Sequence, residues 1–293
     1  MTRQHAYRFL AICLVATLLA VFSSGAHAGP YRDAVLADNP AGYWRLESAG
    51  ATISNEVAGS PGGTLVIEGT GEVSSMSGPI FSEPSNNAIW FNETVGSDNS
   101  NGALYEVLDA AAQLGSNGAY FAVEFWINTA DGGQGNQNPV AKGGATAGAT
   151  FFNKAGDFSF GVNTCCLGAQ GVGVANDVWK HLVGTMERDT PNAGETTMTV
   201  YVDGVQVDSG IPMDGGNPVQ QNDNSTNPFT IGGLRLGTNY YNPWQGKLDE
   251  VAVYTQPVDP ARWTAHFNAA VPEPSAGVLM LIGALALLRR RRG

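Results

Sequence analysis

The chain has 293 residues, with 15 Lys and Arg against 26 Asp and Glu, and a formal net charge of −11 at pH 7. Such an acidic excess repels nucleic acid and anionic lipid, so nucleic acid is not an expected partner. The length allows targeting segments at both ends and one large β domain, or two small ones, between them.

The first 28 residues have the three parts of a signal peptide. Two arginines lie within the first eight residues, residues 9–22 are apolar, and a small-x-small Ala-His-Ala site ends at Ala28. We therefore expect signal peptidase to cut between Ala28 and Gly29 during export. The alternative is an ordinary membrane helix that stays attached.

Residues 29–270 show a period of two, with short apolar stretches between loops rich in Gly, Asn, Asp and Pro. This pattern is typical of an all-β sandwich or barrel. Asp203-Gly204 predicts a tight hairpin, and residues 48–85 are expected to form a long loop with one hairpin over 64–73. The expected strands cover residues 42–46, 87–91, 104–108, 119–128, 139–142, 150–153, 158–162, 179–186, 196–202, 205–208, 229–236 and 247–254.

Two short helices are expected beside these strands. Asp259 is a natural N-cap, and Pro260 suits the first helical position, where its missing N–H costs nothing. This helix should reach about Asn268, and residues 31–36 should form another turn of helix.

Cys165 and Cys166 are adjacent and are the only cysteines left once the signal peptide is removed. Free thiols persist poorly in an oxidising compartment, so a vicinal disulfide is expected. The spacing does not suit a zinc site, and no Cys-x-x-Cys motif indicates redox catalysis.

The C-terminal segment, residues 271–293, contains an apolar run from Val278 to Leu288 and then Arg289, Arg290, Arg291 and Arg292. As a helix the run is roughly 16 Å long, a marginal length for a bilayer core about 30 Å thick. The arginines should hold the end of the chain on the cytoplasmic side. The alternatives are a removable sorting segment and a permanent single-span anchor.

Pro272, Glu273 and Pro274 precede this run, and together the three parts resemble the PEP-CTERM sorting signal. The resemblance implies removal by an exosortase at the inner membrane of a Gram-negative bacterium. The protein would then reach the cell surface or extracellular matrix, touching the membrane only transiently through this segment.

Three further stretches are YRDAVLADNPAGYWRL at 31–46, FAVEFWIN at 121–128 and GKLDEVAVY at 246–254. Together they resemble a laminin G-like domain of the concanavalin A-like lectin/glucanase superfamily. The implied fold is a jelly-roll sandwich of two antiparallel sheets over residues 29–270. Alternation assigns the expected core to Val123, Phe125, Ile127, Trp179, Leu182, Val200, Val202, Leu248, Val251 and Val253.

The same superfamily includes glycoside hydrolases, which need two carboxylates on one face. The stretch around Glu124 offers one carboxylate where the glucanase motif has three acidic residues. Asp249 and Glu250 are neighbours and should point to opposite faces of their strand. His181 and His266 are expected to be packing or surface residues, and no enzyme activity is expected.

Two binding sites remain as candidates. In relatives an aspartate on the last strand often binds structural Ca²⁺, and the resemblance assigns this role to Asp249, with Glu47 as a second ligand. The alternative is that Asp249 caps a turn or pairs with an arginine, Arg45 or Arg262.

The second candidate is a sugar-stacking platform made by Tyr240, Tyr241 and Trp244, which lie among amide side chains. The alternative places Trp244 in the edge of the sandwich and the tyrosines over a neighbouring strand. The sequence thus predicts an exported, non-catalytic module that binds extracellular polysaccharide or another matrix component. The alternatives are a self-associating structural matrix protein and a degenerate or unrecognised glycoside hydrolase.

Overall fold

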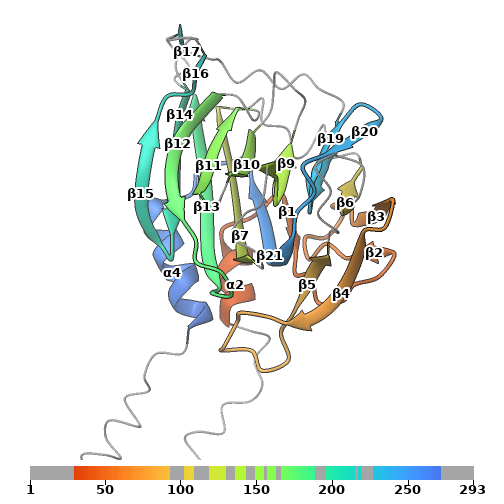
Figure 1. Ribbon diagram of the computed structural model, residues 1–293. Coiled ribbons are helices and arrows are strands. Elements are labelled where there is room, and N and C mark those ends of the chain that lie inside the picture. Colours follow the sequence, from red (N-terminus) through yellow and green to blue (C-terminus); the bar gives the residue numbers. More distant parts are fainter. Residues whose placement is uncertain are drawn as a thin grey trace, which may run out of the picture.

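The computed structural model describes residues 30–92, 102–108, 119–129, 136–142, 149–154, 157–162, 166–188, 196–214, 217–218 and 227–271 (Figure 1). The expected cleavage site at Ala28 and Gly29, Cys165, and the whole tail from Pro272 to Gly293 lie outside these residues. The side chain of Cys166 is not described either. Within the described ranges, no helix has both the length and the apolar character needed to cross a membrane.

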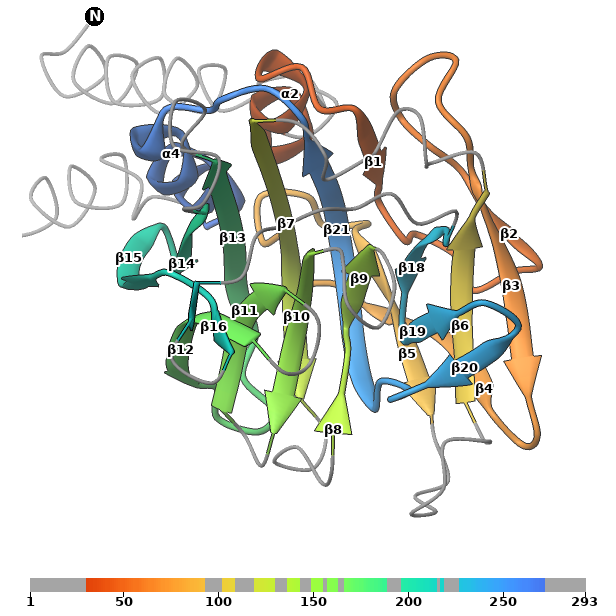
Figure 2. The ribbon, with the colours of Figure 1, turned by 90° about the horizontal axis from the view of Figure 1, so that it is seen from above.

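Two antiparallel sheets form the body of the protein, which confirms the expected all-β class (Figure 2). Sheet A has the order β15-β14-β13-β7-β21-β5-β4, with β1 paired to β21. Its strands are β1 (Gly42–Trp44), β4 (Glu72–Ser77), β5 (Asn87–Asn92), β7 (Tyr120–Thr129), β13 (Lys180–Arg188), β14 (Thr196–Val202), β15 (Val205–Gly210) and β21 (Gly246–Tyr254).

Sheet B has the order β12-β11-β10-β9-β18-β6-β3-β2, with β8 paired to β10. Its strands are β2 (Thr52–Ile53), β3 (Gly63–Glu68), β6 (Gly102–Val107), β8 (Asn136–Gln137), β9 (Val140–Lys142), β10 (Ala149–Lys154), β11 (Asp157–Val162), β12 (Cys166–Gly173) and β18 (Phe229–Ile231). Two small ribbons are separate from both sheets, β16 (Met213–Asp214) with β17 (Asn217–Pro218), and β19 (Leu234–Leu236) with β20 (Asn239–Tyr241).

The inner faces of the two sheets enclose the main core, because alternate side chains of each strand point to the same face. Of the expected core residues, eight lie fully in this core. Val202 is only partly buried against it, and Trp179 packs instead against a second apolar cluster. The contact between the sheets is tight at Gly184, where an added Cβ would lie 2.7 Å from the rings of Phe151 and Phe160.

The second cluster lies between the outer face of sheet A and the helices α2 (Pro30–Ala37) and α4 (Pro260–Ala270) (Figures 1 and 2). The expected N-cap is confirmed, since the Asp259 side chain accepts a hydrogen bond from the backbone N–H of Ala261 at 2.9 Å. Arg262 of α4 pairs with Asp38 at 2.8 Å and so ties α4 to the end of α2.

The hairpin at Asp203-Gly204 is confirmed, with positive φ angles of 51° and 77° that suit its tight turn. The hairpin expected over 64–73 is wrong. Both strands exist, but β3 pairs with β6 in sheet B and β4 pairs with β5 in sheet A. The chain therefore crosses between the sheets here, and no local pattern reports which neighbour a strand will find.

The single strand expected over 229–236 is divided into β18 and β19 at Gly232-Gly233. Gly232 has a φ of +96°, and an added Cβ would lie 2.3 Å from the ring of Phe91. The backbone can make this close turn only without a side chain. The turn directs β19 and β20 out of sheet B. Tyr240 and Tyr241 of the expected aromatic platform therefore lie on this separate ribbon.

Candidate functional site

Glu124, near the middle of β7, is fully buried beneath the two helices. Its carboxylate contacts four groups from four different elements. The hydroxyls of Tyr31 and Tyr254 donate to it at 2.9 and 2.8 Å, and it lies 2.8 Å from Nε2 of His181 and 3.0 Å from Nδ1 of His266. We call these five residues the Glu124 cluster.

Charge holds the Glu124 cluster together. Burial alone would raise the pKa of Glu124, but the charge of His266 and hydrogen bonds from both histidines hold it well below its ordinary value. Burial lowers the pKa of His266, but Glu124 and Asp38 outweigh this effect and raise it. The other ring nitrogen of His266 lies 3.1 Å from the carbonyl of Ala34. Since both nitrogens face acceptors, His266 carries both protons as an imidazolium ion.

None of these five side chains is more than 1% exposed. A substrate polymer therefore has no access to Glu124, and the cluster acts as an ionic clamp between the helices and sheet A. From the sequence, His181 and His266 were expected to be separate packing or surface residues, and the cluster was not predicted. The sequence did contain a signal for it. Glu124 is the one charged residue in the apolar stretch 121–128, and a buried charge needs a partner.

A β-bulge in β21 changes the expected placement of the acidic pair Asp249 and Glu250. The register against β7 shifts between Asp249 and Ala252, and Glu250 has a φ of 53°. Leu248 and Val251 both point into the core between the sheets. Both acidic side chains therefore lie on the outer side, and the expectation that they point to opposite faces is wrong.

Glu250 is the centre of a polar cluster at this bulge. It accepts hydrogen bonds from the hydroxyl of Tyr43 and from Asn86 at 3.2 Å, and it pairs with Arg45 at 3.0 Å. Arg45 also pairs with Glu83 at 2.5 Å. Burial and the repulsion of Glu83 outweigh the contacts from Arg45 and Tyr43 and raise the pKa of Glu250 to about 8.

Asp249 is also fully buried, and no described group forms a hydrogen bond of normal geometry with either carboxylate oxygen. Burial and the charge of Glu250 raise its pKa well above the ordinary value, although Asn86 and the backbone of Glu250 lie close enough to oppose this in part. Its expected alternative partners are engaged elsewhere, Arg45 with Glu250 and Arg262 with Asp38.

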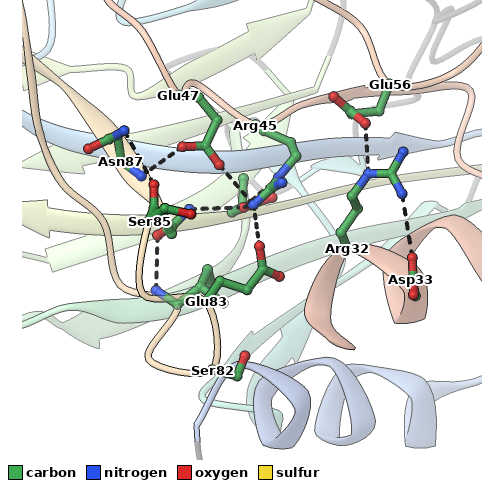
Figure 3. Close-up of polar contacts among 12 residues, drawn as sticks. Arg32, Asp33, Arg45, Glu47, Glu56, Ser82, Glu83, Ser85 and Asn87 are labelled. Carbon is green, nitrogen blue, oxygen red and sulfur yellow. Dashed lines mark hydrogen bonds and ion pairs between the residues drawn. The ribbon is translucent and has the colours of Figure 1, made fainter. Parts of the chain in front are cut away.

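Glu47 belongs to the same region, because its charge also raises the pKa of Asp249. It pairs with Arg45 at 2.8 Å and accepts the backbone N–H of Asn87 at 2.8 Å (Figure 3). Within the described ranges, no three His, Cys, Asp or Glu side chains form a group that could hold a metal ion. A cation here would bind Asp249 and Glu47, with its other ligands from backbone oxygens.

The expected aromatic platform is divided by the structure. Trp244 is 1% exposed and packs in the core against Phe158, with ring centroids 5.9 Å apart. Its indole lies over Gly246, where an added Cβ would be 2.8 Å from the ring. Trp244 is therefore wrong as a sugar-stacking residue, since neither face of its ring is available to a ligand.

Tyr240 and Tyr241 remain partly exposed on the β19–β20 ribbon. The ribbon lies on the outer side of sheet B, because Tyr105 points into the core and the neighbouring Glu106 points away from it. Arg235 lies over the Tyr240 ring, 5.6 Å from its centroid, and forms a short ion pair with Glu106. This surface therefore combines aromatic rings with charged groups.

Two antiparallel sheets packed face to face, with helices over one of them, define a jelly-roll sandwich of the lectin type. The sequence profile of the concanavalin A-like lectin/glucanases superfamily matches residues 99–262. This is more than half of the chain, and the protein belongs to this superfamily. Among curated protein sequences, none matches the chain.

Solved structures with the same fold come from several kinds of protein. Domain 4 of AbnA, a GH43 extracellular arabinanase from Geobacillus stearothermophilus, in complex with arabinotriose, has a TM-score of 0.52 and 14% identity over 78% of this chain and 97% of that domain. Botulinum neurotoxin type C, whose cell entry depends on interaction with two ganglioside molecules, has a TM-score of 0.51 and 13% identity. That match covers 79% of this chain and 51% of the neurotoxin chain.

The sialidase of Trypanosoma rangeli, in complex with sialic acid, has a TM-score of 0.50 and 14% identity over 78% of this chain. The chain thus spans about half the length of the neurotoxin chain and about a third of the sialidase. At these identities the likeness shows a shared fold, and it assigns no ligand or activity to this chain.

Proposed function

We propose that the protein is an exported, cell-surface or matrix-associated module that binds extracellular polysaccharide or another matrix component. The observation that carries this proposal is the position of Tyr240 and Tyr241, two partly exposed rings beside charged groups on the outer side of sheet B. Rings that pack on pyranose faces and polar groups that bond hydroxyls form a common mode of sugar recognition. Neighbours of the same fold bind an arabinose oligomer and gangliosides, which supports this choice of ligand class.

The proposed module is non-catalytic. Retaining glycosidases hold two carboxylates about 5 Å apart where the substrate can reach both. Glu124, Asp249 and Glu250 are all fully buried in this protein. These carboxylates support structure, and the neighbouring glycosidases resemble this chain in fold alone.

The proposed route to the outside depends on the two terminal segments, through signal peptidase at one end and an exosortase at the other. The described chain starts in α2 and ends just after α4, and these helices lie side by side on one face (Figure 1). A fold whose two ends leave from one face can be held at a membrane by its tail while its opposite face stays free.

A structural role in the matrix is the second candidate function. Val205 and Val207, on the outermost strand β15 of sheet A, are 63% and 48% exposed. Exposed apolar edge strands can pair with another chain. Assembly that rises with protein concentration, without any glycan binding, would favour this role.

The binding role predicts that Tyr241→Ala weakens polysaccharide binding about tenfold, equivalent to about 1.4 kcal/mol. The measurement is a glycan-array screen of the full chain in mild detergent, followed by titration of the best ligand. Phe81→Ala is the matched control, because Phe81 is an exposed ring, 66% accessible, in a different loop. Equal losses in the two variants, or no glycan bound at all, would contradict the proposal.

We also propose a structural Ca²⁺ ion bound by Asp249 and Glu47, supported by the two buried oxygens of Asp249, which accept no hydrogen bond of normal geometry from the described residues. A bound ion at 100 times its Kd adds about 2.7 kcal/mol. The expected result is a Tm that falls by roughly 5–10 °C on addition of EDTA and recovers with Ca²⁺. Asp249→Asn should abolish this response, and Glu56→Gln should keep it, because Glu56 pairs with Arg32 outside the site.

A Tm that ignores both EDTA and Ca²⁺ would rule the ion out. Asp249 would then be protonated, as its raised pKa allows, and Asp249→Asn would leave the Tm nearly unchanged.

A further inference from the structure

A small apolar slot lies beneath the β19–β20 ribbon. Its volume is about 10 Å³, which is enough for one group of about the size of a water molecule. Its apolar lining comes from Val66 of β3, from Gly102, Ala103 and Leu104 of β6, and from Pro243. Glu68 and the two tyrosines of the proposed binding surface, Tyr240 and Tyr241, complete the lining.

The chemistry of this lining disfavours water and favours a methyl group. A trapped water needs two to four polar partners, and side chains such as Val66, Leu104 and Pro243 offer none. An aliphatic group of the same size loses no hydrogen bonds in such a slot, and its transfer out of water is favourable in free energy.

Charge at the slot restricts the ligand further. The Glu68 carboxylate lines the slot, and its charge contributes to the raised pKa of the neighbouring Tyr240 hydroxyl. A carboxylate in this position can accept hydrogen bonds from ligand hydroxyl groups. The nearby Arg235 is already paired with Glu106. The carboxylates of Glu68 and Glu106 outnumber the single positive charge of Arg235. The net negative charge repels uronic acids, sulfates and other anionic sugars.

We propose that the slot seats the methyl group of a neutral sugar while Glu68 accepts its hydroxyls and Tyr240 and Tyr241 pack against its ring. The ligand class is therefore a polysaccharide with 6-deoxy or N-acetyl sugars. This inference rests on the proposed binding function and adds a specificity to the same surface.

The test compares pairs of sugars in which one member carries the methyl group and the other lacks it, by competition against the polysaccharide bound by the full chain. L-Fucose and L-galactose form the 6-deoxy pair, and N-acetylglucosamine and N-formylglucosamine form the acetyl pair. We expect the methyl-bearing member of one pair to compete at least fourfold better, and the pair that shows the difference identifies the source of the methyl group. Saturation-transfer NMR should show the strongest transfer to the methyl protons.

Val66→Phe is designed to fill the slot and should remove the difference within the pair. Val207→Phe, on the exposed strand β15, is the matched control and should keep the difference. The NMR measurement on the unmodified chain keeps the proposal testable if Val66→Phe does not fold.

The outcomes separate the two levels of the proposal. Polysaccharide binding with no methyl preference, or a preference that survives in folded Val66→Phe, overturns the slot and leaves the binding function standing. A chain that binds no polysaccharide overturns both.

Discussion

Glu124→Gln is expected to lower the free energy of unfolding by about 3–5 kcal/mol, because it leaves the imidazolium of His266 buried beside a neutral group. The substitution keeps the size of the side chain, so the loss comes from the ion pair rather than from packing. Urea denaturation followed by far-UV circular dichroism measures the change. Tyr31→Phe removes one of the four contacts and should cost less, about 2 kcal/mol.

The pH dependence of stability tests the same clamp. The pKa of Glu124 is depressed in the folded protein, so its contribution is present above its ordinary value of 4.5 and is lost as pH falls through the depressed value. The pKa of His266 is raised, so its contribution is complete below 6.5 and is lost as pH rises through the raised value.

The difference between the original protein and Glu124→Gln should therefore be largest between about pH 4.5 and 6.5 and decline on both sides. A difference that does not change with pH, or one below about 1 kcal/mol, would mean that the cluster is not ionised as described.

Trp244→Ala is expected to destabilise the protein by about 3–5 kcal/mol, because it opens a large cavity between the sheets beside Phe158. The partly exposed Tyr241 provides the comparison, since Tyr241→Ala should change the free energy of unfolding by less than about 1 kcal/mol. Both values come from the same urea titrations. A stable Trp244→Ala variant that had lost only glycan binding would restore Trp244 to the ligand surface and contradict its buried position.

The elements that the sequence predicted well depend on residues close together in the chain. Alternation over 121–128 located β7, Asp203-Gly204 located a hairpin, and Asp259-Pro260 located the start of α4. In each case the signal and the structure that it predicts lie within a few residues. The boundaries differ by one or two residues at most of these elements.

The missed elements have weak local signals. β12 contains three glycines and little alternation. β3 and β4 lie in a Gly- and Ser-rich region where only one local hairpin was expected, and each of them pairs with another strand instead. Their pairing partners stabilise them as strands. The separation of β18 from β19 depends on Phe91, which lies more than 130 residues earlier in the chain.

The candidate sites were predicted less well than the fold. The sequence brought attention to Asp249, Glu47, Tyr240 and Tyr241, and the structure places the first two in one polar region and the other two on one ribbon. The prediction that Trp244 stacks on a sugar was wrong, because the neighbouring residues in the sequence do not show whether the ring points into the core or to the surface. The acidic pair was misplaced because a bulge adds one residue to the alternation.

By itself the sequence determined the β class of the body, the alternating core and the short helices, because these follow from the covalent period of two and from local caps. Only the tertiary structure decided that Glu124 meets His181 and His266, 57 and 142 residues further along the chain. The same holds for the burial of Trp244 and the slot beneath Tyr240 and Tyr241. Such contacts form only when the two sheets and the two helices pack together. The surfaces that stabilise this packing come from residues distant in the chain, so no local stretch of sequence reports them.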